Sequence, residues 1–136
     1  RDLHIGIDIG APVGEAIHAF SDGVVHSLGI NPEPGSYGPT IIIKHELKGK
    51  PIWALYGHLS MESLDMVSEG MQVSEGQIVA TVGDESVNGG WAPHLHFQLC
   101  WEEPQVNDMP GVVAREDREW ALEKYPDPRI VLGPLY

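Results

Sequence analysis

Residues 93–99 read PHLHFQL, and their strict alternation is the clearest structural signal in the chain. A β-strand sends successive side chains to opposite faces, so this stretch predicts a strand over 93–100 with its leucines and phenylalanine facing a core. His94, His96 and Gln98 would share the other face. Two imidazoles two residues apart on one face are typical of a zinc site, although two hydrogen-bonded structural histidines would give the same pattern.

The rest of the chain extends this pattern. Short β-branched runs separated by turn signals dominate, and long helical periodicity is nearly absent, which together predict an all-β domain. Within it, Asp22-Gly23 predicts a tight hairpin turn. The Ser-Glu-Gly triplets at 68–70 and 74–76 predict turns on either side of a very short strand. Strands are expected near residues 4–9, 15–20, 23–29, 39–45, 51–57, 71–73, 77–82 and 93–100.

One helix is expected near the carboxyl end. Residues 114–124 are rich in Glu, Asp and Arg, and Pro126 would stop the helix. The segment after it is expected to be irregular. We therefore predict a single domain over 1–136, with its core in residues 3–100 and a short helix and irregular tail over 101–136.

Composition and charge exclude several classes of protein. The 136 residues are 42% hydrophobic, enough to bury a real core. The formal net charge of -12 repels phosphate backbones, so no nucleic-acid partner is expected. No apolar run approaches the roughly 18 residues of a membrane span. The single Cys100 rules out an internal disulfide framework. A start at Arg1 without a signal peptide favours a piece of a longer protein, and no pattern assigns an oligomeric state.

Two further polar features lie outside the 93–99 stretch. In a strand over 4–9, His4, Gly6 and Asp8 would share one face, and glycine would leave room there for an ion and a water. His58 follows an apolar strand, at a strand end where functional residues often lie. Taken alone, the His4–Asp8 pair fits an incidental surface strand equally well, and His58 fits a turn histidine better.

Together these pieces resemble the lysostaphin-type zinc metallopeptidases, also called LytM-like or Gly-Gly endopeptidases. That family carries a His-x-x-x-Asp motif early, a Tyr-x-His-Leu segment in the middle and a His-x-His motif late. The corresponding segments here are HIGID at 4–8, YGHL at 56–59 and HLH at 94–96. Three motifs in the family's order, with similar connecting segments, extend the resemblance over about residues 3–100.

The resemblance implies a site and an activity. His4, Asp8 and His96 would bind one Zn²⁺ ion per chain, and His58 and His94 would be the catalytic histidines. The fold would be a twisted antiparallel architecture of the barrel-sandwich hybrid (duplicated hybrid motif) type, with a groove over the sheet. Three protein ligands with one open position are the catalytic pattern. The expected reaction is zinc-dependent hydrolysis of a peptide bond, of the peptidoglycan cross-bridge type, with His94 as general base and His58 stabilising the oxyanion, or the reverse.

A finer resemblance supports an alternative. The segments at 88–98, 109–112 and 126–128 look like a branch in which a peptidase-like domain lies between a sugar-kinase-like phosphotransferase and a pyridoxal-phosphate aminotransferase. The chain would then be a non-catalytic or unusual-substrate module of a larger multi-domain protein. The typical family member implies the cell envelope or an extracellular location, whereas the fused branch implies the cytoplasm.

Two other interpretations are weaker. Residues 70–80 resemble the hairpins of a lipoyl- or biotinyl-type carrier domain, but no lysine lies in the Met-Lys setting that such a carrier modifies. His45, at the end of the strand over 39–45, is expected to be structural or else to orient a ligand beside the groove. His18 and His26 are expected to be structural or surface residues.

Overall fold

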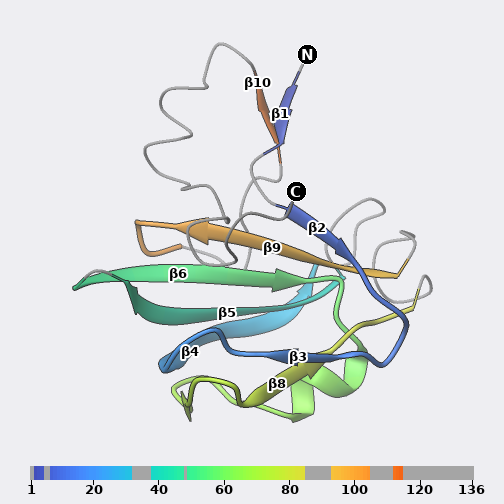
Figure 1. The fold of residues 1–136 in the computed structure, drawn as a ribbon, viewed down its shortest axis with the longest axis horizontal. Helices are drawn as coiled ribbons and strands as arrows, with labels where there is room; N and C mark the ends of the chain where they lie inside the picture. Colours follow the sequence, from blue (N-terminus) through green and yellow to red (C-terminus); the bar gives the residue numbers. More distant parts are fainter. Residues whose placement is uncertain are drawn as a thin grey trace.

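The computed structural model describes residues 2–4, 7–31, 38–47, 49–84, 93–104 and 112–114, with side chains over 9–30, 38–47, 49–84 and 93–104. This part of the chain is almost entirely antiparallel sheet (Figure 1). In chain order the elements are β1 (Asp2–His4), β2 (Ile7–Gly10), β3 (Ala16–His18), β4 (Gly23–Asn31), β5 (Gly38–Leu47), β6 (Lys50–Gly57), the 3-10 helix η1 (Met61–Asp65), β7 (Gln72–Val73), β8 (Ile78–Thr81), β9 (His94–Cys100) and β10 (Val112–Ala114).

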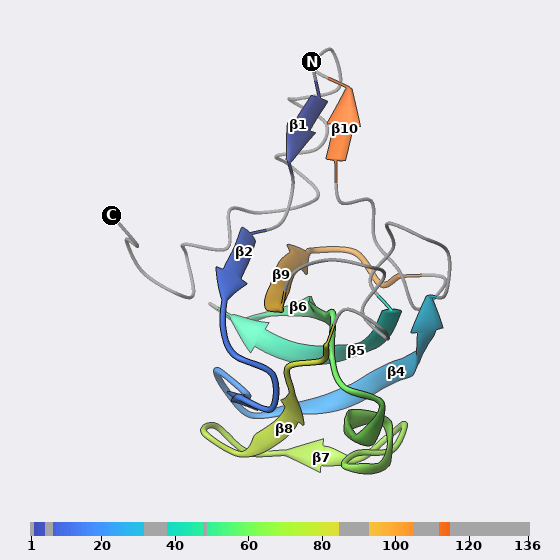
Figure 2. The same cartoon turned by 90° about the vertical axis from the view of Figure 1, so that its right-hand side faces the viewer.

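One six-stranded sheet forms the body of the protein. Its strands lie in the order β2-β9-β6-β5-β4-β7, with every neighbouring pair antiparallel. Figure 2 shows how strongly this sheet curls from β9 through β6 and β5 to β4. The central strands are the most apolar, because Ile41, Ile42 and Ile43 on β5 are all fully buried. Runs of this kind suit a strand that is covered on both faces.

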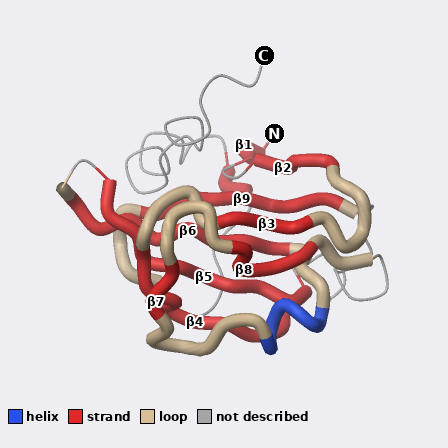
Figure 3. Tube along the Cα trace, turned by 60° about the horizontal axis from the view of Figure 1, so that its bottom comes forward, coloured by secondary structure: helices blue, strands red, loops and turns tan. Residues whose placement is uncertain are grey.

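A two-stranded sheet of β3 and β8 packs against one face of this body (Figure 3). The core lies between the two layers. It includes Ile17 and Ala80 from the small sheet and Ile43, Tyr56 and Phe97 from the large one. Phe97 and Leu99 are buried there and Leu95 packs at its edge, as the alternation over 93–99 predicts. The all-β fold predicted from the sequence is therefore confirmed.

The turns at the two Ser-Glu-Gly triplets are also confirmed. They flank β7, and the amide of Met71 donates to the Ser68 carbonyl at 2.9 Å. Gly70 and Gly76 have φ of 85° and 82°, the left-handed region in which a side chain would be strained. Both triplets therefore end in glycine because the backbone turns there.

The hairpin predicted at Asp22-Gly23 is wrong. The preceding strand β3 pairs with β8, whereas β4 pairs with β5 and β7, so residues 19–22 connect two different sheets. Gly23 is the first residue of β4. A Cβ built on it would lie 2.5 Å from the Lys44 carbonyl oxygen. Glycine is therefore needed here because the backbones of β4 and β5 approach closely, and not because the chain makes a tight turn.

The amino-terminal end of the predicted core differs from expectation. The expected single strand over 4–9 is divided, because β1 pairs with β10 and β2 pairs with β9 in different sheets. Figure 1 shows β1 and β10 projecting from the body. The helix expected over 114–124 lies outside the described residues except for Ala114, which instead ends β10. Among the described residues, no helix is long and apolar enough to cross a membrane.

Candidate metal and catalytic site

Strand register brings most of the predicted site residues to one end of β9. In the β2–β9 pair, Asp8 is the cross-strand partner of His96, and in the β6–β9 pair Gly57 is the partner of His96. His58 follows directly after Gly57. His4 lies in β1, where its partner is Val112 of the separate two-stranded sheet. The side chains of His4 and Asp8 are not among those that the structure describes, so their metal binding stays a prediction.

Three imidazoles meet at this point. The ring centroids of His58 and His94 are 4.3 Å apart, and those of His58 and His96 are 6.1 Å apart at nearly right angles. His58 and His96 are buried, with 4% and 7% of their surface exposed, and His94 is half-buried. The middle motif and the late motif, 35 positions apart in the chain, therefore form one cluster, as the family resemblance implies.

The backbone at His58 is strained. Its φ of 62° makes it the one non-glycine residue with positive φ in the part of the chain that the structure describes. This conformation costs roughly 1–2 kcal/mol for a residue with a side chain. The amide of Gly83 donates to the His58 carbonyl at 3.0 Å, and that of Leu59 donates to the Pro39 carbonyl at 3.1 Å. Strain that the surrounding structure maintains in this way is concentrated at functional sites.

Two glycines make room for this arrangement. Gly57 lies beside His96 in the ladder and presents no side chain to compete with the imidazole. Gly83 lies against the turn at His58, because a Cβ there would come within 2.3 Å of the Leu59 carbonyl oxygen. Neither glycine was predicted from the sequence to belong to the site. Gly57 could have been recognised from its place inside the YGHL segment, whereas nothing near Gly83 in the sequence points to a contact 24 residues earlier.

The donor chemistry of this cluster suits a transition metal. Imidazole nitrogens together with one carboxylate are the ligands of catalytic zinc sites. Among the described side chains, no group of three or more His, Cys, Asp or Glu residues could hold a metal by itself. His4 and Asp8, the two residues that the resemblance adds to His96, are not among the described side chains. The register sets Asp8 opposite His96, so the donor set predicted from the resemblance is chemically compatible with zinc.

Comparison with known proteins assigns the chain to a family. The model of "Peptidase family M23" matches residues 2–108. The chain belongs to peptidase family M23. It is 35% identical over 108 residues to the DD-carboxypeptidase/endopeptidase Mpg of Neisseria meningitidis, which covers 79% of this chain and 21% of Mpg. It is 36% identical over 104 residues to the murein hydrolase activator NlpD of Escherichia coli, covering 76% of this chain and 24% of NlpD. This M23 chain thus spans about a fifth to a quarter of these relatives.

Solved structures agree with this family assignment. The catalytic domain of lysostaphin from Staphylococcus simulans superimposes with a TM-score of 0.64 at 26% identity, covering 96% of this chain and 80% of that one. The lysostaphin-type resemblance drawn from the three motifs is therefore confirmed. The comparisons do not address a fusion to phosphotransferase and aminotransferase domains, which stays a prediction.

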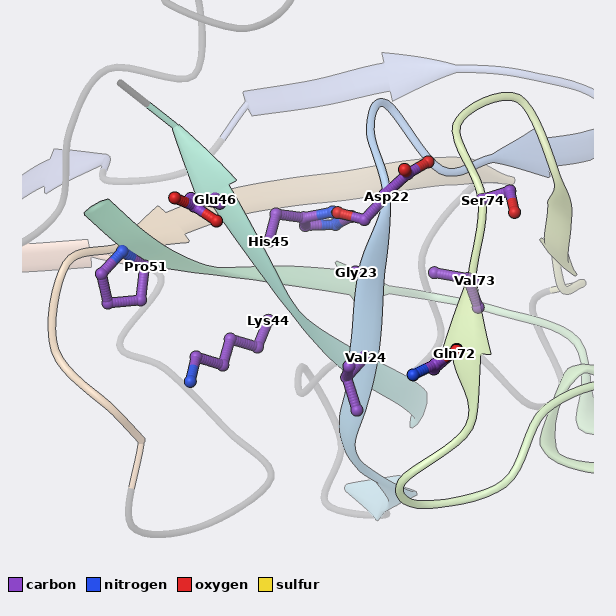
Figure 4. Close-up of a pocket in the computed structure, with 10 residues that line it drawn as sticks. All are labelled: Asp22, Gly23, Val24, Lys44, His45, Glu46, Pro51, Gln72, Val73 and Ser74. Carbon is purple, nitrogen blue, oxygen red and sulfur yellow. The ribbon is translucent and has the colours of Figure 1, made fainter. Parts of the chain in front are cut away.

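His45 lies apart from this cluster, beside a pocket of about 620 Å³ at the other end of β5 (Figure 4). Its Nδ1 lies 3.1 Å from the Ser21 carbonyl oxygen and 3.3 Å from that of Asp22, so Nδ1 carries the proton. Its Nε2 then accepts from the Tyr56 hydroxyl at 3.2 Å. This buried network ties the start of β4 to β5 and β6 and supports the structural interpretation of His45. The pocket is lined by Asp22, Gly23, Val24, Lys44, His45, Glu46, Pro51, Gln72, Val73 and Ser74.

The His45 network predicts sensitivity to acid. Burial lowers the pKa of His45 below its ordinary 6.5, against the opposing effect of the Asp22 and Ser21 carbonyls. Below pH 6.5 the unfolded chain therefore binds a proton that the folded chain resists, and stability falls as the pH drops from about 6.5. We expect the free energy of unfolding in urea to decrease less between pH 7 and pH 5 in His45→Gln than in the wild type. His18→Gln, which replaces an exposed histidine, is the control. An identical decrease in His45→Gln and the wild type would contradict the prediction.

Proposed function

We propose that this chain is a zinc-dependent endopeptidase that hydrolyses a peptide bond of the peptidoglycan cross-bridge type. The observation that carries the proposal is the meeting of His58, His94 and His96 at the position where β9 pairs with Asp8. Imidazoles gathered in this way are suited to metal binding and to proton transfer at neutral pH. A relative named a peptidoglycan DD-endopeptidase, ShyC of Vibrio cholerae, supports the substrate class, and so does the endopeptidase Mpg.

His4, Asp8 and His96 would hold one zinc ion per chain. Cross-strand partners share one face of a sheet, so the register of Asp8 with His96 supports their membership of one ligand set. When bound, zinc supplies an activated water nucleophile at neutral pH and polarises the carbonyl of the scissile bond. His58 and His94 belong to the same cluster but would stay off the metal.

The different environments of His94 and His58 favour different roles. Half-buried His94 is exposed enough to pass a proton to solvent, which suits a general base that accepts the proton of the attacking water and returns it to the leaving amine. His58 is buried and held in its strained turn, so its ring is fixed in place before the substrate arrives. A fixed donor suits stabilisation of the developing oxyanion. The products would be a new carboxylate and a free amine.

A second candidate is a non-catalytic or unusual-substrate module of a larger protein. The similarity to NlpD, named a murein hydrolase activator, favours this candidate over other non-enzymatic functions. The limited share of the relatives that the chain spans is compatible with either candidate. The full set of motif residues in this chain favours catalysis, because a binding module has no need to keep both off-metal histidines.

Amine release decides between the two candidates. The purified chain, loaded with zinc, would be incubated with cross-linked muropeptides and with oligoglycine peptides, beside a chelated sample and a chelated sample restored with zinc. Release of new amines that disappears on chelation and returns with zinc would support the endopeptidase and identify the bond cleaved. One tightly bound zinc per chain without amine release from any substrate would overturn the cell-wall endopeptidase and favour the module.

A further inference from the structure

The amide side chain of Gln98 contacts the ring of His96. Both residues project from the same face of β9, two positions apart, and Gln98 Oε1 lies 2.9 Å from His96 Nε2. Gln98 is fully buried, at 0% exposure. A buried amide is costly unless its polar atoms form hydrogen bonds, so this contact is part of how the site is built. It joins a residue outside the family's three motifs to a predicted zinc ligand.

We propose that Gln98 is a positioning residue that fixes the tautomer and orientation of His96 so that this imidazole presents Nδ1 to the metal. The inference rests on the proposed zinc function. It assigns no contact with substrate to Gln98, which would act only through His96.

The chemistry of the contact determines the tautomer. An amide oxygen can only accept a hydrogen bond, so His96 Nε2 must carry the proton. A ring nitrogen that carries a proton has no lone pair for a metal, so a metal bound by His96 must lie at Nδ1. Partners of this kind, on the far ring nitrogen of a metal-binding histidine, orient the ring and raise its basicity.

Packing holds Gln98 in place for this task. Its cross-strand partner on β6 is Leu55, which is also fully buried, and the partner of His96 is Gly57. Gln98 therefore lies beside an apolar side chain in the sheet. His96 lies beside a residue with no side chain, so the ring can follow the amide. Leu55 and Gly57 near the end of β6 thus pack beside Gln98 and His96, and His58 follows directly after this strand.

Zinc affinity tests the inference without reference to catalysis. We expect Gln98→Leu, which has no acceptor, to bind zinc about 10- to 100-fold more weakly than the wild type in competition with a chromophoric chelator. Gln98→Glu keeps an acceptor at the same distance and is expected to bind at least as tightly as the wild type. Gln72→Leu removes an exposed glutamine of β7, a strand that does not contribute to the cluster of His58, His94 and His96, and is expected to leave the affinity unchanged.

A second measurement observes the tautomer directly. Long-range ¹H–¹⁵N NMR spectra of the wild type are expected to show His96 protonated at Nε2 both with and without zinc. Protonation at Nδ1 would overturn the inference even if Gln98→Leu failed to fold. Equal zinc affinity of folded Gln98→Leu and wild type would also overturn it while leaving the proposed function intact. A wild-type chain that binds no zinc would overturn the proposed function and, with it, the role of Gln98 toward a metal.

Discussion

Replacing His94 with alanine is expected to lower the rate of amide hydrolysis by about 10²–10⁴-fold while leaving the affinity for zinc close to that of the wild type. The ring of His94 lies against that of His58, at 4.3 Å between centroids, and it is more exposed than the other two imidazoles of the cluster. Its loss removes the group best placed to move a proton between the attacking water and the leaving amine. Rates of amine release and zinc binding, measured on the same preparations, separate the two effects.

His96→Ala is the matched comparison. His96 is predicted to be a metal ligand, so this variant is expected to lose both zinc binding and turnover, whereas His94→Ala loses turnover alone. His18→Ala, which replaces an exposed histidine of β3, is expected to keep both. If His94→Ala lost zinc and His96→Ala kept it, the assignment of ligand and base within the HLH motif would be reversed.

Local patterns were enough to predict the strand that carries this motif. Alternation with a period of two assigns each residue of β9 to a face, and the buried Phe97 and Leu99 confirm the assignment. The same reasoning located β4, β5 and β6 to within about two residues. It failed at residues 19–23, because a glycine that avoids a clash with Lys44 has the same sequence signature as a glycine in a hairpin.

The meeting of His58 with His94 could not be derived from any local pattern. It depends on the pairing of β6 with β9, whose residues are about 40 positions apart, and on the left-handed backbone at His58. A histidine is not the residue that a sequence-based argument places at positive φ. Only the order of the three motifs, recognised as that of a family, linked these residues before the structure did.

The early motif is the part in which strand periodicity was least informative. Alternation placed His4 and Asp8 on one face of a single strand, but β1 and β2 pair in different sheets. Asp8 still arrives opposite His96, because that relation depends on the register of β2 with β9. The prediction for Asp8 therefore has support from register, whereas that for His4 rests on the family resemblance.

The strained turn at His58 leads to a second large effect, in which activity and stability separate. His58→Gly and His58→Ala both remove the imidazole and are expected to lower amide hydrolysis by about 10²–10³-fold. Their stabilities should differ. Glycine adopts a φ of 62° without strain and alanine does not, so we expect the free energy of unfolding of His58→Gly to exceed that of His58→Ala by about 1 kcal/mol. Urea unfolding of the two variants measures the difference.

Exposed Glu15 provides the control pair, because its φ is not positive. There the order should reverse, with alanine more stable than glycine by about 0.4–1 kcal/mol. Alanine more stable than glycine at position 58 as well would show that the left-handed turn is not kept in solution.

The expected order at position 58 also bears on why histidine occupies this turn. Glycine would be the less strained residue at this turn, and the surrounding structure, including the hydrogen bond from the Gly83 amide to the His58 carbonyl, maintains the turn with histidine in place. A loss of stability at His58 is therefore what we expect if selection has kept the imidazole there for catalysis.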